Sequence, residues 1–336
     1  MGIELSVIWA VIILFSIMMY IVMDGFDLGL GILFPFFKDK EDRDLMMHTV
    51  APVWDGNETW LVLGGAGLLA AFPLAYSVVL SALYLPIIFM LIGLIFRGVA
   101  FEFRFKALDH ERHFWDKAFI GGSIAATFFQ GVTLGAYIQG LPVVDRTYAG
   151  GSLDWLSWFS VFTGLGLVVA FALLGSTWLI IKTEGALHER AHIITRYLVW
   201  VLLAFIFIIS VLTPLMDDKI AARWFSFPNI LWFSPVPILV AVFAFLLLRA
   251  VKNRTHVQPF IFTLGLIFLG YSGLGISLWP NIIPPDISIW QAASPPQSQG
   301  FVLVGALFII PIILVYTFWA YYVFRGKIKP GMGYDH

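Results

Sequence analysis

Cysteine is absent from this chain of 336 residues, and charged residues are scarce. The lack of cysteine excludes disulfide bonds, thiolate catalysis and cysteine-ligated metal clusters. Asp, Glu, Lys and Arg together make up only 12% of the sequence, whereas a soluble globular domain contains about 25%. The net charge of −1 leaves no excess of positive charge for binding nucleic acid. The chain therefore has too few charged side chains to cover an ordinary aqueous surface.

Apolar residues dominate the composition of the chain. Hydrophobic residues make up 60% of the chain and aromatic residues 17%, and the mean hydropathy is +0.89. Inside lipid every backbone polar group must be paired, which allows only helices or closed barrels. The apolar runs are long and continuous rather than alternating, so they predict an all-α polytopic membrane protein. The start, Met1–Glu4, lacks the positive charge of a cleaved signal, so we expect the first helix to be retained.

Nine apolar runs are long enough to cross a bilayer, which takes about 20 residues. We predict spans at residues 5–36, 48–71, 76–101, 117–139, 156–181, 194–215, 229–249, 257–279 and 301–324. All of them belong to a single transmembrane domain over residues 1–336. The charged turns that follow the first and fifth spans suggest an internal repeat. We therefore predict two four-helix units, about 1–140 and 150–280, and one peripheral helix at about 301–324.

Basic residues are concentrated in alternate loops. They follow the first, third, fifth and seventh spans and recur in the C-terminal tail, which contains Lys329. The opposite side has only Arg146, Lys219 and Arg223. Because loops rich in Lys and Arg stay in the cytoplasm, this asymmetry predicts an external N-terminus and a cytoplasmic C-terminus.

Acidic residues gather near the predicted cytoplasmic ends of the first spans. Two pairs have the spacing i, i+3, which places the members of each pair on one face of a helix. The predicted orientation brings both pairs to one depth, together with two charged residues from the third span. The six residues are Asp24, Asp27, Asp55, Glu58, Arg97 and Glu102.

This cluster has two interpretations. Acids inside membrane-spanning segments are costly and mark ion or proton routes, so Asp55, Glu58 and Asp24 are candidate proton carriers. Asp27, Arg97 and Glu102 are candidates for an ion pair or a cation site, and Asp27 is the candidate metal ligand within this cluster. Alternatively, the cluster is a structural ion-paired group whose outer members reach toward the interface.

Aromatic and histidine side chains supply the other candidates. Trp54 and Trp60 flank the second acidic pair and are candidates for an O2 or quinone route, with packing as the alternative. Membrane haems take axial ligands from within helices, but the histidines here lie in or beside charged cytoplasmic segments. We therefore expect no haem to be ligated by this chain. His188 and His192, near Glu184, form either a metal site or a solvated helix end.

Five motifs spread along the chain carry a family resemblance. They are Asp24–Gly29, Ala51–Glu58, Phe96–Glu102, Gly185–His188 and Pro311–Thr317. Together they resemble subunit II of the bacterial cytochrome bd-type ubiquinol oxidases. The short outer loops and the ending Phe324–Lys327 are most similar to the cyanide-insensitive branch of that family.

The resemblance implies a quinol:O2 oxidoreductase of the bacterial inner membrane, with the N-terminus in the periplasm, that generates proton-motive force. Subunit I would carry two b-type haems and one d- or b-type haem, while this chain would ligate no cofactor. A structural quinone occurs in subunit II of some members, and a small single-span accessory subunit is a further candidate partner.

The resemblance also assigns roles to single positions. Asp55 matches a position implicated in proton delivery from the cytoplasm, and Trp60 matches one beside a proposed oxygen route. Asp27 and Arg97 match an ion-paired or cation site. Glu58 stands where some relatives have an amide, which would add a titrating group to the proton route.

Two other classes of function remain open. Acids in the membrane and an internal repeat also suit a proton- or cation-coupled secondary transporter. Transporters usually build a central site from both halves, whereas the acids here crowd into the first three spans. An assembly or anchoring protein is the third class.

Overall fold

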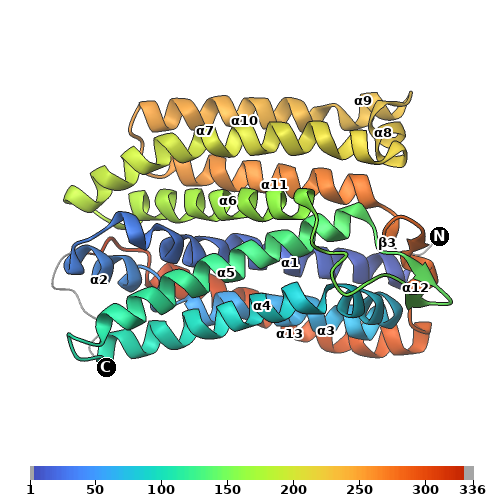
Figure 1. Ribbon diagram of the computed structural model, residues 1–336, viewed down its shortest axis with the longest axis horizontal. Coiled ribbons are helices and arrows are strands. Elements are labelled where there is room, and N and C mark those ends of the chain that lie inside the picture. The colour runs from blue at the N-terminus through green and yellow to red at the C-terminus, as the bar shows by residue number, and fades with distance from the viewer. Residues whose placement is uncertain (1–3, 329–336) are drawn as a thin grey trace.

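The computed structural model describes residues 4–328, so Lys329 and the other residues of 1–3 and 329–336 lie outside the described part. The long helices run side by side in one elongated bundle (Figure 1). In the described range, eight helical segments are long and apolar enough to cross a membrane. They are α1 (Leu5–Leu33, extended by the 3-10 turn η1, Phe34–Phe36), α4 (Pro73–Lys106), α5 (Arg112–Gln139), α6 (Trp158–Lys182), α7 (Gly185–Met216), α10 (Pro235–Lys252, preceded by α9, Asn229–Phe233), α11 (Gln258–Leu278) and α13 (Pro296–Val323).

The second predicted span, 48–71, is the exception. Its beginning is taken up by the end of α2 (Lys40–His48) and a turn, and α3 (Trp54–Ala71) has only 18 residues with polar side chains in its first two turns. α3 still packs along α1 and α4 inside the bundle. The start of α1 and the end of α13 lie at opposite ends of the bundle, which requires an odd number of crossings (Figure 1). The prediction of an all-α polytopic membrane protein is confirmed.

Short elements close the end of the bundle where the chain begins (Figure 1). Two antiparallel pairs of strands lie there, β1 with β2 and β3 with β4, together with short helices. The bounds are α8 (Asp218–Phe225), α12 (Ile289–Ala292), β1 (Val143–Val144), β2 (Thr147–Tyr148), β3 (Asn281–Ile283) and β4 (Ile287–Ser288). α2 lies at the opposite end, which is the predicted cytoplasmic side.

α1 and α6 cross at the centre with their backbones in contact. A Cβ atom added at Gly29 would lie 2.0 Å from the backbone oxygen of Phe171, and one at Gly175 would lie 2.6 Å from the carbonyl carbon of Gly29. Small residues permit such close approach in membrane proteins. α1 also packs against α3 and α5, while α6 packs against α7 and α11. The division into two four-helix units and a peripheral helix stays a prediction.

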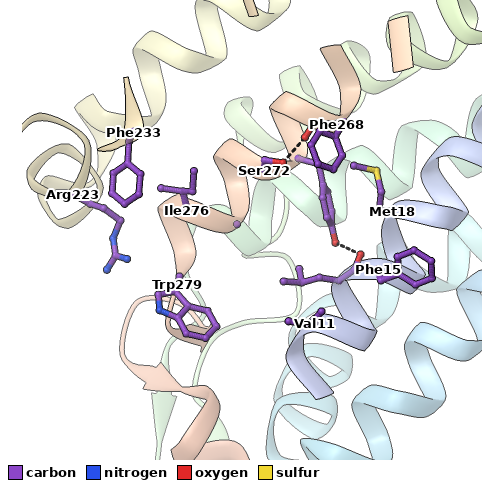
Figure 2. Close-up of a pocket in the computed structure, with 12 residues that line it drawn as sticks. Val11, Phe15, Met18, Arg223, Phe233, Phe268, Ser272, Ile276 and Trp279 are labelled. Atoms are coloured by element: carbon purple, nitrogen blue, oxygen red, sulfur yellow. Dashed lines mark hydrogen bonds between the residues drawn. The ribbon is translucent and has the colours of Figure 1, made fainter. Parts of the chain in front are cut away.

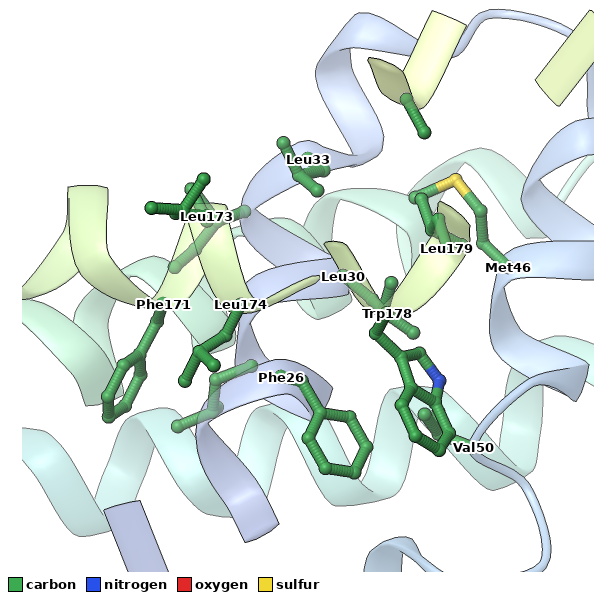
Figure 3. Close-up of a cluster of buried hydrophobic side chains, with 14 of the residues drawn as sticks. Phe26, Leu30, Leu33, Met46, Val50, Phe171, Leu173, Leu174, Trp178 and Leu179 are labelled. Atoms are coloured by element: carbon green, nitrogen blue, oxygen red, sulfur yellow. The ribbon is translucent and has the colours of Figure 1, made fainter. Parts of the chain in front are cut away.

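An apolar core surrounds this crossing (Figure 3). Phe26 of α1 stacks on Trp178 of α6, with ring centroids 4.3 Å apart. The Trp178 indole donates a hydrogen bond to the Thr49 hydroxyl at 3.2 Å, which ties the turn after α2 to this core. Leu30 and Leu174 fill the space beside the stacked rings. This packing fixes the rotation and height of the part of α1 that contains Asp24 and Asp27.

Candidate functional site

Arg97 of α4 is the centre of a buried ion-pair cluster. Its side chain is 1% exposed, and its Nη2 atom donates to Asp24 Oδ1 at 2.7 Å and to Glu58 Oε2 at 3.1 Å. Asp24 is fully buried, whereas Glu58 is 30% exposed. The Trp54 ring covers the guanidinium, with its centroid 5.5 Å from Cζ, a geometry that stabilises a cation. One arginine therefore ties three helices together.

Asp27 has a different partner. Asn57 of α3 donates from Nδ2 to Asp27 Oδ2 at 2.8 Å and to the Met23 carbonyl at 3.2 Å. The Tyr321 hydroxyl of α13 in turn donates to Asn57 Oδ1 at 2.9 Å. A buried carboxyl group, an amide and a phenol thus form a hydrogen-bonded chain across α1, α3 and α13.

Two details of the predicted cluster need correction. The prediction paired Arg97 with Asp27, but the guanidinium bonds Asp24, which lies about 4.5 Å away from Asp27 along the helix axis. Glu102 is exposed and, within residues 4–328, takes part in no ion pair with Arg97. Five residues rotate the side-chain direction by about 140° around a helix, so Glu102 leaves the face of α4 that carries Arg97.

Asp55 lies at the outer edge of the cluster. It is exposed at the start of α3, and it remains near enough to interact electrostatically with Glu58. Exposure therefore falls stepwise from Asp55, through the partly exposed Glu58, to the buried Asp24. The four predicted acids do lie in one region, but at very different depths from the surface.

The two tryptophans have separate surroundings. Trp54 is partly buried between Arg97 and the ring of Phe101, whose centroid is 5.3 Å away. Trp60 is 1% exposed and meets Phe15 of α1 edge-on, with centroids 5.8 Å apart. Trp54 therefore belongs to the ion-pair cluster, and Trp60 belongs to the contact between α3 and α1.

An apolar recess of about 520 Å³ lies between α1, α8 and α11 (Figure 2). Phe15, Phe268 and Trp279 line it, and Arg223 adds a positive charge from α8. The Tyr271 hydroxyl in its wall donates to the Leu14 carbonyl at 2.9 Å. An apolar recess with a few polar groups suits a long hydrophobic ligand with a polar head.

The described residues contain no group of three or more His, Asp or Glu side chains that could hold a metal ion. His188 and His192 do lie close together, with ring centroids 4.8 Å apart, and His188 Nδ1 faces the Ile180 carbonyl at 3.1 Å. His192 is only 4% exposed, so this pair is not simply a solvated helix end.

Sequence reasoning missed Asn57 and Tyr321. Asn57 lies inside the acidic motif of α3, so a polar amide beside Glu58 was an available signal. Tyr321 is 264 residues away from Asn57 in the chain. Nothing in its local pattern separates it from the other aromatic residues of α13.

The chain matches the model of a known protein family over nearly its whole length. The family model described as cytochrome bd terminal oxidase subunit II matches residues 5–324. The chain belongs to this family. As a multi-span subunit of a bacterial respiratory oxidase, it is a protein of the inner membrane, and the family implies haems in the partner subunit.

Curated relatives agree with this assignment to subunit II. The probable cytochrome oxidase subunit 2 of Haemophilus influenzae is 30% identical, with 96% of this chain and 95% of the relative covered. The cytochrome bd-I ubiquinol oxidase subunit 2 of Escherichia coli strain K12 is 29% identical with the same coverage. The cytochrome bd ubiquinol oxidase subunit 2 of Bacillus subtilis is 27% identical, with 96% of each chain covered.

A solved structure has the same fold. A chain of the bd oxidase from Geobacillus thermodenitrificans superposes with a TM-score of 0.77 over 95% of this chain and 98% of that chain. The two sequences are 16% identical. The likeness therefore establishes the fold of this subunit II.

Replacing Asn57 with alanine tests the hydrogen-bonded chain. We expect the variant to lose stability, because Asp27 loses its amide donor and the Tyr321 hydroxyl loses its acceptor. Leaving a buried polar group unpaired costs about 1–3 kcal/mol. The measurement is the thermal unfolding midpoint of the purified complex. Thr213→Ala is the control, since among residues 4–328 that hydroxyl bonds only the Ile209 carbonyl of its own helix. Equal midpoints for both variants would contradict the role of Asn57.

Proposed function

We propose that this chain is the non-haem subunit of a bd-type quinol:O2 oxidoreductase. It scaffolds the haem-bearing subunit I and contributes a cytoplasmic proton route for the reduction of O2 to water. The observation that supports the route is the stepwise burial of acids, from the exposed Asp55 through Glu58 to Asp24. A small single-span accessory subunit is a further proposed partner.

The charge balance of the cluster suits the transfer of protons. One guanidinium, that of Arg97, faces the three carboxyl groups of Asp24, Asp27 and Glu58. If all three were ionised, the cluster would be negative, and negative charge buried away from water is costly. A proton taken up by one carboxyl group relieves this excess. Glu58 is placed for the exchange, since it bonds Arg97 on one side and is partly exposed on the other.

Subunit I would cover the face that carries Asp55. A Cβ atom at Gly56 would lie 3.9 Å from the Tyr316 ring, which places the start of α3 beside α13. α3, α4 and α13 each expose large apolar side chains, among them Val62, Ile95 and Tyr316. When bound to subunit I, the haems would supply the electrons that reduce O2. Asp55 and Glu58 would pass cytoplasmic protons across this contact, and protons released outside on quinol oxidation would leave a charge gradient.

The apolar recess and the tryptophans form a second proposed element. Phe15 lines the recess and also contacts Trp60, so the recess and Trp60 lie next to each other. We infer that the recess accommodates the isoprenoid tail of a structural quinone, and that Trp60 and Trp54 border an O2 route. Asp27 stays a candidate cation ligand, held in place by Asn57.

Two substitutions test the proton route. Asp55→Asn and Glu58→Gln should each slow quinol-dependent O2 uptake by roughly 100-fold, the lower end of what a positioned proton-transfer group contributes. Haem content should be unchanged, because neither side chain is proposed to ligate a haem. The measurement is O2 uptake by the purified complex across a pH series, alongside its haem spectrum.

Glu102→Gln is the matched control. It removes an exposed acid of α4 that lies one to two turns from Arg97 and outside the cluster. Normal turnover at every pH in both test variants would rule out the route. Solute flux catalysed by the isolated chain would favour a transporter instead.

A further inference from the structure

A second charged site lies apart from the acid cluster, at the end of the bundle that carries α2. A recess of about 340 Å³ opens between α2, the end of α4 and the start of α5. Five cationic side chains line it: Lys38, Lys40, Arg43, Arg104 and Arg112. Asp109 and Asp116 also line it, and Asp44 contacts Arg104 from behind. Five cations against three carboxylates leave the recess positive.

The inner cations are already paired. Asp116 accepts from Arg104 Nε at 2.5 Å and from Arg43 Nη1 at 2.6 Å. Arg104 is 2% exposed and also donates to Asp44 at 2.5 Å. Arg43 donates from Nε to the Phe37 carbonyl at 2.7 Å. These bonds hold Arg104 and Arg43 against Asp116, and the three side chains form the floor of the recess.

The outer cations are held more loosely than the inner ones. Within residues 4–328, Lys38 makes no hydrogen bond or ion pair. Arg112 Nε donates to the Ala107 carbonyl at 3.3 Å, and the guanidinium lies 3.8 Å from Asp44 and 3.7 Å from Asp109, both beyond hydrogen-bond length. Lys40 bonds Asp109 at 2.9 Å, but the two side chains are 56% and 85% exposed, and such surface pairs contribute little. The hydrogen bond from Lys40 and the charge of Arg112 lower the pKa of the Asp109 carboxyl, in keeping with a positive surrounding.

Exposed apolar side chains adjoin the recess along the chain. Phe36 and Leu108 are each 64% exposed and Phe114 is 60% exposed. They lie one or two residues from residues that line the recess, namely Lys38, Asp109 and His113. Positive charge beside exposed hydrocarbon is the environment of a lipid headgroup, whose phosphate meets the cations while its chains cover the apolar rim.

We propose that this recess binds the phosphate of an anionic phospholipid, with Lys38 and Arg112 as the donors. Phosphate is the chemistry that fits: it accepts several hydrogen bonds from Lys and Arg. The apolar rim favours a phosphate that carries acyl chains over free phosphate. The proposal concerns a structural lipid and is independent of the proton route.

The test is binding of phosphatidylglycerol to the delipidated, purified complex. The variant Lys38→Gln/Arg112→Gln should bind this lipid roughly 30-fold more weakly, because each cation near an anionic lipid contributes about 1 kcal/mol. Neither side chain is held by a close buried ion pair, so the variant should fold and assemble. Bound lipid is counted by native mass spectrometry over a phosphatidylglycerol titration, with phosphatidylcholine as the zwitterionic comparison.

Lys106→Gln/Lys117→Gln is the matched control, since it removes two exposed charges from the same end of the bundle without touching the recess. It should bind phosphatidylglycerol like the parent complex. Equal loss in both variants would reduce the effect to general surface charge and overturn the site. Displacement of the lipid by inorganic phosphate, at an ionic strength matched with chloride, would overturn the assignment to a phospholipid. Unchanged affinity for phosphatidylglycerol in the Lys38→Gln/Arg112→Gln variant would overturn the site.

Discussion

Replacing Arg97 with alanine is expected to remove most of the assembled complex from the membrane. Asp24 is fully buried, and the pair with Arg97 is its one ion pair among the described residues. Removing one partner of a buried pair costs about 3–5 kcal/mol, because the other charge is left uncompensated. Total stabilities of proteins are about 5–15 kcal/mol, so this loss is a large share. The measurement is the yield of haem-containing complex per membrane protein, after size-exclusion chromatography.

A double variant separates charge from shape. Arg97→Met with Asp24→Leu replaces the pair by apolar side chains, which is often neutral for stability. Glu58 can then turn toward solvent, because 30% of it is already exposed. The double variant should assemble much better than Arg97→Ala. If both fail equally, or if Arg97→Ala assembles normally, the buried pair is not what stabilises this region.

The second large effect is expected for Gly29→Ala. The added Cβ would lie 2.0 Å from the Phe171 carbonyl oxygen and close to the Gly175 nitrogen. Both are backbone atoms, so no change of rotamer can relieve the overlap, and α1 must move away from α6. Overpacking typically costs 1–3 kcal/mol, and a clash between two backbones should reach or exceed about 3 kcal/mol. We expect a lower unfolding midpoint and less complex.

Gly121→Ala is the control for this experiment. Apart from the adjoining backbone of its own helix, no atom of residues 4–328 lies within 4 Å of the position a Cβ would take there, in the first half of α5. Alanine is favoured over glycine inside helices by about 1 kcal/mol, so this variant should be as stable as the parent or slightly more so. Equal midpoints for Gly29→Ala and Gly121→Ala would show that the crossing tolerates separation.

The positions of the spans could be predicted from the sequence because long apolar runs carry that signal directly. The proximity of Asp24, Glu58 and Arg97 could also be predicted, since the charged turns fix which helix ends meet. The choice of partner could not be predicted. Whether Arg97 meets Asp24 or Asp27 depends on the height of α1 within the bundle, which is set by close helix contacts such as that between Gly29 and Phe171.

Two other features were outside the reach of local patterns. Glu102 lies outside the cluster because it points from a different side of α4 than Arg97. Its predicted depth in the membrane does not specify that direction. The link from Asn57 to Tyr321 joins residues that are 264 positions apart. The shortness of α3, by contrast, follows from the polar residues in its first two turns. An expectation based on hydropathy averaged over 48–71 therefore overestimated the length of this helix.

The bond between Tyr321 and Asn57 also bears on how the subunit is made. Among the long helices of residues 4–328, α13 follows all the others in the chain, so Asn57 Oδ1 gains its phenol donor only once α13 has been made. A nascent chain inserted only as far as α11 therefore has an unfinished hydrogen-bonded chain beside Asp27. Completion of the acid-rich site is thereby linked to the synthesis of α13, so a chain that lacks this helix does not form the finished site.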